Sequence, residues 1–471
     1  MARSPSLDKG LAMAELRSSL LRASAIPLLW TALCGLLIIV SLDASPHVGL
    51  VSFDAGNFIL AGRHFNIAAD RPHLPGYPGI VALSACADPI LGPASGLRLL
   101  GLLIPLSAIL LGLGLHKRLG WKGAMWTQTL LLTSPVVWFF ALAAETYAVD
   151  LAAGTIVTLI IVRDRDHRWL PALLGVTSFF RPMTAVLLLP GILWLLWSKR
   201  SSLSLTTLTV PLIVATAALG ATIYGIVLGS GGIDGLKALV AMGPPVAFRP
   251  FSELVPFLAY GTWFCIPLIP MLLTRSSDAP DTCTKPLFIV FITALVFFVT
   301  VHYAKGYLLL VVPATIVGVV TAKRVTWTMM AMIVVLQCTL FLLIPSADDP
   351  LPRDAPGSSS SAFVRVWERF TSSYSCTLDR LDHEHRFWDQ AMPWMNEHTG
   401  PIMFSKEVAP SVRIAQAVRS ASDKSTSIWW GHARKDDQEW VRYDENGVHI
   451  ERMLDTALSA ATLFTRDSLS K

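Results

Sequence analysis

Charged residues are scarce in this sequence. They make up 15% of the 471 residues, against 53% for hydrophobic residues, and the mean hydropathy is +0.54. A soluble chain of this length would fill its core with less apolar surface, so the composition excludes a soluble globular protein and indicates an integral membrane protein. The net charge of +5 lies in short basic clusters between apolar runs, as membrane topology demands, and is therefore no sign of a nucleic-acid partner.

Several sequence motifs are also missing. The chain has no P-loop, no Gly-rich dinucleotide turn, no CxxC pair and no HExxH, so it lacks the signatures of the nucleotide, redox and zinc-protease sites that those motifs build. Most of the six cysteines lie in apolar segments, so no disulfide framework is expected. There is no internal repeat, and no inverted duplication of the kind that transporters show.

The basic clusters predict a membrane topology. Basic residues between Arg3 and Arg22 precede the first apolar run, which we interpret as an uncleaved signal-anchor; a cleaved signal peptide is the alternative. Placing each later basic cluster on the cytoplasmic side gives about eleven spans, and the interrupted stretch 78–92 becomes an interfacial helix. The predicted spans are 26–42, 97–115, 123–141, 145–162, 169–181, 183–197, 207–228, 253–273, 286–303, 306–322 and 326–345.

The domain organisation follows from this path. The expected fold is an all-α polytopic membrane domain over residues 26–345, preceded by a cytoplasmic segment 1–25 and containing a first extracytoplasmic loop at 43–96. A Pro- and Ser-rich linker at 346–361 leads to a small soluble extracytoplasmic domain at 362–471. Alternation around Glu445-Asn446-Gly447 predicts a hairpin there, and we expect this domain to be α+β.

The first loop carries the leading candidate residues. Asp54 follows the first span closely, and polar groups at the bilayer edge are costly to organise unless they serve a function. We interpret Asp54 as a general base for an attacking hydroxyl; the structural alternative is a helix N-cap. His73 stands in a stiff, proline-rich segment that ends at Tyr77, which suits a partner for a phosphate or hydroxyl, or else a simple turn.

Further candidates lie at the other predicted outer turns. Glu145 and Tyr147 begin one span and are expected to help bind the acceptor or a divalent ion, or to orient a neighbouring Arg; extension to water is the alternative. Arg181 is either a phosphate clamp or an exposed turn residue. A last group gathers cations and phenols at headgroup level, where an ordinary interfacial belt is the alternative. This group consists of His302, Lys305 and Tyr307.

These residues together resemble the GT-C superfamily of membrane glycosyltransferases. The chain is most similar to the branch containing protein O-mannosyltransferases and aminoarabinose and related lipid-linked sugar transferases. The resemblance covers roughly residues 26–345 and matches nothing in the tail. It rests on Asp54-Ala-Gly-Asn-Phe58, His73-Leu-Pro-Gly-Tyr-Pro78, Arg98, Glu145-Thr-Tyr147, Arg181-Pro182, Lys305-Gly-Tyr307 and a basic cytoplasmic turn.

The resemblance implies an activity. It implies inverting transfer of a sugar from a polyprenyl-phosphate donor to a protein, lipid or glycan acceptor, on the outer side of the cytoplasmic membrane. Asp54 is then the base, and Lys305 and Arg181 contact the donor phosphate. Asn57 stands where the related branch usually has Glu, so a metal site built from two neighbouring carboxylates is in doubt. A divalent metal ion stays open as a cofactor.

Two other functions remain open from the sequence. A transporter or flippase of lipid-linked sugars would need polar groups at the bilayer midplane, whereas the candidates here lie at its outer edge. A non-catalytic membrane assembly partner would use the Trp-rich tail as its binding surface.

Overall fold

The computed structural model describes residues 53–69, 71–92, 94–143, 145–242, 305–321 and 326–343, single positions in the tail, and the backbones of five short strands between 402 and 464. Three of the expected spans, 26–42, 253–273 and 286–303, lie outside these residues. So does His302. The number of spans therefore stays a prediction.

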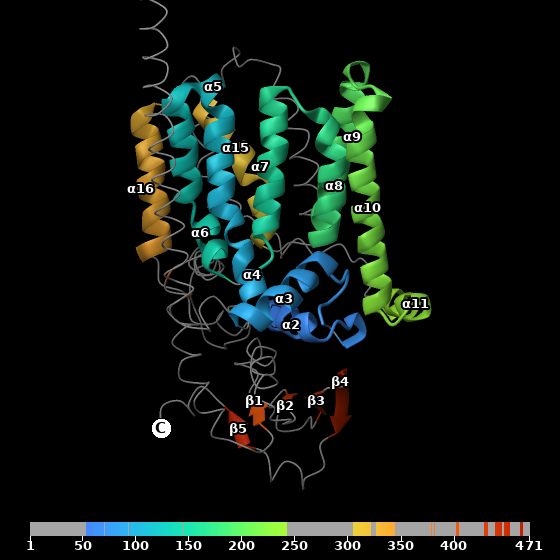
Figure 1. Ribbon diagram of the computed structural model, residues 1–471. Coiled ribbons are helices and arrows are strands. Elements are labelled where there is room, and N and C mark those ends of the chain that lie inside the picture. The colour runs from blue at the N-terminus through green and yellow to red at the C-terminus, as the bar shows by residue number, and fades with distance from the viewer. Residues whose placement is uncertain are drawn as a thin grey trace, which may run out of the picture.

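Most of the described chain forms upright helices packed side by side (Figure 1). α7 packs against both α5 and α15, and α8 packs against both α9 and α10. The buried apolar side chains of these helices form one continuous core. The upright helices are α5 (Leu103–Leu132), α6 (Pro135–Leu142), α7 (Ala148–Arg163), α8 (Leu170–Phe180), α9 (Pro182–Ser198), α10 (Leu205–Gly229), α15 (Val312–Thr321) and α16 (Trp327–Leu343).

Shorter helices cover one end of this bundle. α2 and α3 lie across the lower ends of the upright helices in Figure 1, and α2 packs on α3. The orientation of α3 agrees with the interfacial helix expected at 78–92. We call this the site end. Its elements are α2 (Phe53–Arg63), η1 (Ile67–Ala69), α3 (Pro78–Leu91), α4 (Ser95–Leu100), α11 (Ile233–Met242) and η5 (Lys305–Leu310).

Prolines account for two departures from the expected spans. The span expected at 123–141 ends at Leu132, and α6 begins anew at Pro135; η5 similarly gives way to α15, whose second residue is Pro313. Proline lacks an N–H and disfavours helix in the residue before it, so it starts helices and does not continue them. The turn expected at 116–122 is present: Gly120, with φ 67° and ψ 173°, interrupts α5. Gln128 Nε2 donates a hydrogen bond to the carbonyl of Ala108 at 3.0 Å, so the two halves of α5 lie side by side.

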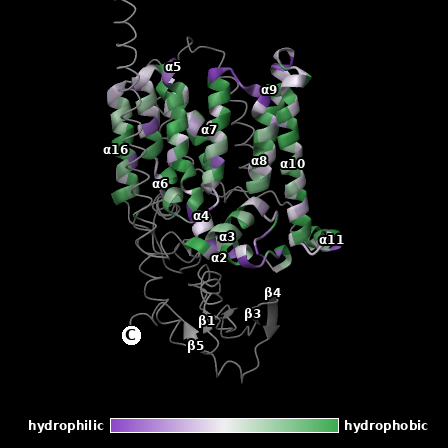
Figure 2. Cartoon of the chain, in the orientation of Figure 1, coloured by the Kyte–Doolittle hydropathy of each residue, from purple (hydrophilic) through white to green (hydrophobic). Residues whose placement is uncertain are grey.

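The upright helices consist mostly of apolar residues, which Figure 2 colours green. By length and composition, the helical stretches 95–132 and Leu205–Gly229 could each cross a membrane. α10 exposes many large side chains, among them Ile213 and Leu228 at 62% and 61%. Contiguous apolar surface of this extent marks contact with another apolar phase. This agrees with the membrane protein that the composition indicates.

The tail contains a five-stranded sheet of order β4-β3-β2-β1-β5. β3 and β4 pair antiparallel, with Asp444 opposite Gly447, where the sequence predicts a hairpin. The wider α+β domain at 362–471 stays a prediction. The strands are β1 (Ile402–Phe404), β2 (Ile428–Gly431), β3 (Glu439–Asp444), β4 (Gly447–Arg452) and β5 (Thr462–Phe464).

Candidate functional site

Three polar side chains of the first loop form a row at the site end. Asp54 lies in the first turn of α2, inside the helix, and His73 and Tyr77 precede α3. Nδ1 of His73 lies 3.4 Å from Oδ1 of Asp54, and Nε2 of the same ring lies 3.3 Å from the hydroxyl of Tyr77. The side chains of Asp54 and His73 are 41% and 35% exposed, whereas Tyr77 is buried. The row therefore runs from solvent into the protein.

The backbone of Tyr77 is held in an uncommon conformation. Its φ of 47° is left-handed, a region that costs a bulky residue about 1–3 kcal/mol. Packing holds the residue there, because the Tyr77 ring lies edge-on to the buried Phe58 ring, with 5.1 Å between the two ring centres. Phe58 also lies edge-on to His73 at 6.2 Å. Strain of this kind concentrates at functional sites, where the surrounding structure determines it.

Deeper in the protein lies a buried ion pair. Arg181 stands at the junction of α8 and α9, with Nε 3.0 Å from Oδ2 of Asp150 in the first turn of α7. Thr184 donates a hydrogen bond to the Asp150 carboxylate, and Arg181 donates to the hydroxyl of Thr146. Both charged side chains are almost wholly buried, at 3% and 0% exposure. Buried charges persist only when they are paired and hydrogen-bonded, as here.

Three tyrosine rings surround the same guanidinium. Its carbon lies 4.2 Å from the centre of the Tyr147 ring, 4.8 Å from that of Tyr307 and 5.9 Å from that of Tyr77. These are cation–π distances. We call Arg181 with these three rings the tyrosine cage. Because Tyr77 belongs both to the cage and to the row from Asp54, one set of contacts connects the exposed carboxylate to the buried ion pair.

The protonation state of Tyr77 follows from its burial. Desolvation raises the pKa of this phenol above its ordinary value, and the positive charge of Arg181 offsets only part of that rise. Tyr77 is therefore a neutral hydroxyl, able to donate a hydrogen bond to His73, throughout the physiological range.

The structure brings together most of the residues that the sequence singled out. Asp54, His73, Tyr77, Tyr147, Arg181 and Tyr307 all belong to the connected set of contacts. Glu145 precedes Thr146 and is buried, so it does not extend to water. Lys305 opens η5, two residues before Tyr307, and its side chain lies outside the described ones, as His302 does.

Sequence reasoning missed the inner members of this site. Asp150, Thr146 and Thr184 were not candidates. Asp150 had a usable signal, because an ionisable residue inside an apolar helical run is a functional candidate by default. The threonines had none, since hydroxyls are common in such helices.

The carboxylates do not form a ready metal site in the described chain. Among the residues that the structure describes, no group of three or more His, Cys, Asp and Glu side chains is placed to hold a metal ion. Asn57, where a related branch usually has Glu, is fully buried in α2 one turn after Asp54.

Comparison with known proteins identifies the fold. No protein-family model matches the chain, and no curated protein sequence matches it significantly. The crystal structure of ArnT from Cupriavidus metallidurans bound to undecaprenyl phosphate is similar with a TM-score of 0.56 and 14% identity, over 86% of this chain and 92% of that one. The apo structure of the same protein gives 0.53, with the same identity and coverage. The chain therefore shares the fold of these ArnT structures, in agreement with the GT-C resemblance of its sequence.

Proposed function

We propose that this chain is a membrane glycosyltransferase that transfers a sugar from a polyprenyl-phosphate donor to an acceptor at the site end. The observation that carries the proposal is the connected row from the exposed Asp54, through His73 and Tyr77, to the buried Arg181. The fold supports it, because the similar ArnT structure holds undecaprenyl phosphate.

The proposed reaction is a single displacement. An acceptor hydroxyl attacks the anomeric carbon of the donor sugar, and Asp54 takes the proton of that hydroxyl. The bond from the anomeric carbon to the phosphate oxygen breaks at the same time, and polyprenyl phosphate leaves with the bonding electrons. Attack opposite the leaving group inverts the configuration of the sugar. The exposure of the Asp54 side chain supports this role, because an acceptor can reach it.

His73 and Tyr77 are positioning residues in this scheme. The neutral Tyr77 hydroxyl donates to Nε2 of His73, which leaves the ring proton on Nδ1, facing Oδ1 of Asp54. The ring then holds one carboxylate oxygen and leaves the other for the acceptor proton.

The cage residues serve the donor. Charge develops on the leaving phosphate, and fixed cations stabilise that charge in a site of low dielectric. Lys305, in the same short helix as Tyr307, and Arg181 are the proposed cations. Tyr147 and Tyr307 present their rings and hydroxyls beside Arg181, and Glu145 is proposed to orient the acceptor.

The proposed orientation places the site end outside the cytoplasm. The clusters at 116–122, 163–168 and 199–200 lie at the opposite end of the bundle, and basic residues favour the cytoplasmic side. The protein is then a multi-pass protein of the cytoplasmic membrane. The tail domain is extracytoplasmic in the same scheme.

The test is sugar transfer by the purified chain in proteoliposomes. Undecaprenyl phosphate carrying labelled sugars is supplied with a membrane-glycan extract as acceptor, and released undecaprenyl phosphate is measured. We expect Asp54→Asn to slow release by about a hundredfold to ten-thousandfold, as loss of a general base does.

Asp234→Asn is the matched control, because Asp234 is a fully solvated carboxylate at the same end. Its release rate should equal that of the unaltered chain. Full release by Asp54→Asn would remove Asp54 as the base. Movement of the lipid-linked sugar across the bilayer without any release would replace the proposal with a flippase.

A further inference from the structure

The end of the bundle opposite the site carries a group of basic residues. Figure 2 shows hydrophilic residues at the upper ends of α7 and α9, and the kink of α5 lies at the same end. Eight lysines and arginines stand here against two aspartates, Asp164 and Asp166. We call this group the basic rim. Its cations are Lys117, Arg118, Lys122, Arg163, Arg165, Arg168, Lys199 and Arg200.

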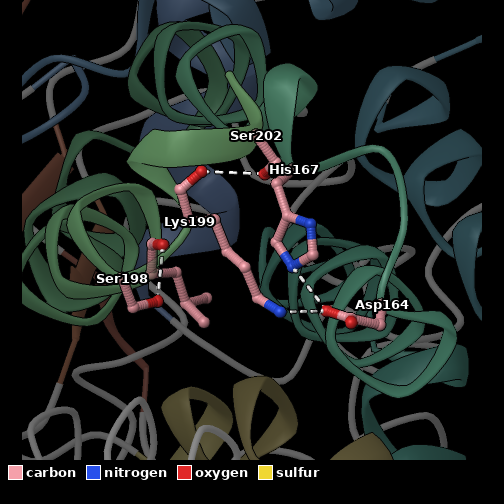
Figure 3. Close-up of polar contacts among 6 residues, drawn as sticks. Asp164, His167, Ser198, Lys199 and Ser202 are labelled. Atoms are coloured by element: carbon pink, nitrogen blue, oxygen red, sulfur yellow. Dashed lines mark hydrogen bonds and ion pairs between the residues drawn. The ribbon is translucent and has the colours of Figure 1, made fainter.

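One cation of the rim serves the fold itself. Lys199, at the end of α9, places Nζ 2.6 Å from Oδ1 of Asp164 at the end of α7, and Nε2 of His167 lies 3.6 Å from the same oxygen (Figure 3). The Lys199 hydrogen bond lowers the pKa of Asp164, so this carboxylate stays ionised at neutral pH. These contacts join the ends of two helices, and Lys199 is therefore occupied.

Three other rim cations lie over exposed tryptophan rings. Nζ of Lys122 is 5.7 Å from the Trp121 ring and 5.8 Å from the Trp327 ring. The other two pairs are Arg168 over Trp169 at 6.0 Å and Arg200 over Trp197 at 4.5 Å. Among the residues that the structure describes, none of these three cations forms an ion pair with a carboxylate. Their charge remains available to an outside partner.

The tryptophans show where this partner lies. Tryptophan rings settle at the boundary between hydrocarbon and headgroups, and these four rings are 40–69% exposed around the end of an apolar bundle. A cation held on such a ring lies at headgroup depth. The site end differs, because Arg181 there is buried with Asp150, and the exposed Lys237 pairs with Asp234 at 3.0 Å.

We propose that the basic rim binds the headgroups of anionic phospholipids through Lys122, Arg168 and Arg200, each held in place by its tryptophan. The phosphate of such a headgroup is the complementary charge, and the neighbouring ring packs on its glycerol and upper acyl carbons. Binding there would hold this end of the bundle in the anionic, cytoplasmic leaflet. The proposal does not depend on the glycosyltransferase assignment.

The test is a lipid titration of the purified full chain in neutral detergent. Phosphatidylglycerol is added in competition with phosphatidylcholine, and bound lipid is counted by native mass spectrometry. The unaltered chain should prefer phosphatidylglycerol. Each cation near an anionic membrane surface contributes about 1 kcal/mol to the binding free energy. Arg200→Gln should therefore weaken phosphatidylglycerol binding about fivefold, and replacement of all three cations by Gln should weaken it about a hundredfold.

Lys237→Gln is the control, since it removes an exposed cation at the other end and should leave the preference unchanged. Equal binding of the two lipids by the unaltered chain would overturn the proposal, and so would unchanged binding by both Arg200→Gln and the triple variant. Inorganic phosphate forms a separate arm. Displacement of phosphatidylglycerol by an equal concentration of phosphate would show a site for the free anion and would also overturn the proposal.

Discussion

Each end of the bundle contains an ion pair between a basic residue and an aspartate, but one pair is buried and the other is exposed. At the site end, Arg181 and Asp150 are buried together, with hydroxyls and tyrosine rings around them. At the basic rim, Lys199 and Asp164 form a pair that is 36% and 58% exposed. The two pairs have similar distances, 3.0 and 2.6 Å, so burial and not geometry separates them.

Burial determines what each pair can do. A buried charge without its partner is strongly unfavourable, so the inner pair holds α7, α8 and α9 in one arrangement. An exposed pair contributes about 0–1 kcal/mol, because water competes for both groups. The site end is therefore expected to be intolerant of substitution, whereas the rim can change residues without loss of the fold.

Breaking the inner pair should give the largest effect. Asp150→Asn leaves the Arg181 guanidinium buried without a counter-charge, and we expect a loss of about 3–5 kcal/mol in the free energy of unfolding. The matched substitution at the rim, Asp164→Asn, should cost about 1 kcal/mol or less. Denaturant unfolding in detergent measures both.

Replacing both Asp150 and Arg181 by apolar residues separates the effect of the unpaired charge from the effect of packing. The double variant Asp150→Leu with Arg181→Met should recover most of the stability lost in Asp150→Asn, because no unpaired charge remains. Equal losses for Asp150→Asn and Asp164→Asn would contradict the contrast between the two ends.

Close packing at the site end predicts the next effect. A Cβ on Gly306 would fall on the Tyr147 ring, so Gly306→Ala should push Tyr147 away from Arg181 and cost about 1–3 kcal/mol. Gly220 in α10 has nothing within 4 Å of an added Cβ, and Gly220→Ala should raise stability by about 0.5–1 kcal/mol. Thermal unfolding compares the two, and a neutral Gly306→Ala would show that the cage is loosely packed.

The Tyr77 hydroxyl tests the connection between the row and the cage. Tyr77→Phe removes one partly buried hydrogen bond to His73 and should cost about 1 kcal/mol. Under the proposed function it also slows undecaprenyl phosphate release and changes its pH profile, because the His73 tautomer is no longer fixed. Tyr224→Phe, at a tyrosine 70% exposed on α10, should change neither quantity. An unaltered pH profile in Tyr77→Phe would limit Tyr77 to a structural role.

Most members of the site were predictable, whereas the residues that pair with Arg181 were not. Asp54, His73 and Arg181 were found because polar residues beside Pro and Gly at the ends of apolar runs are locally conspicuous. The distances between these side chains depend on how α2, α3 and α9 pack together. That packing could not be predicted by reading a single sequence. Asp150 was missed because the topology was predicted from the positions of basic clusters. An acidic residue one turn inside a span does not affect that prediction, so it attracted no attention.

The fold was predicted in the same uneven way. The apolar runs located α7, α9, α10 and α16 to within a few residues, because hydrophobicity alone defines them. The run at 123–141 was read as one helix although Pro135 divides it. A proline within an apolar run can either kink a helix or begin a new one, and tertiary packing decides between these outcomes.

The smallest expected effect concerns His167 at the basic rim. Burial lowers the pKa of this imidazole, and the neighbouring Asp164 offsets part of the change. Below about pH 6.5 the unfolded chain binds a proton that the folded chain does not, so the free energy of unfolding should fall as pH decreases from neutral.

The slope of the free energy of unfolding against pH should be a fraction of the value for one whole proton, which is about 1.4 kcal/mol per pH unit. His167→Gln should flatten this slope in thermal unfolding between pH 5 and 7.5. A slope that persists in His167→Gln would assign the acid sensitivity to another group and would remove this difference between the ends.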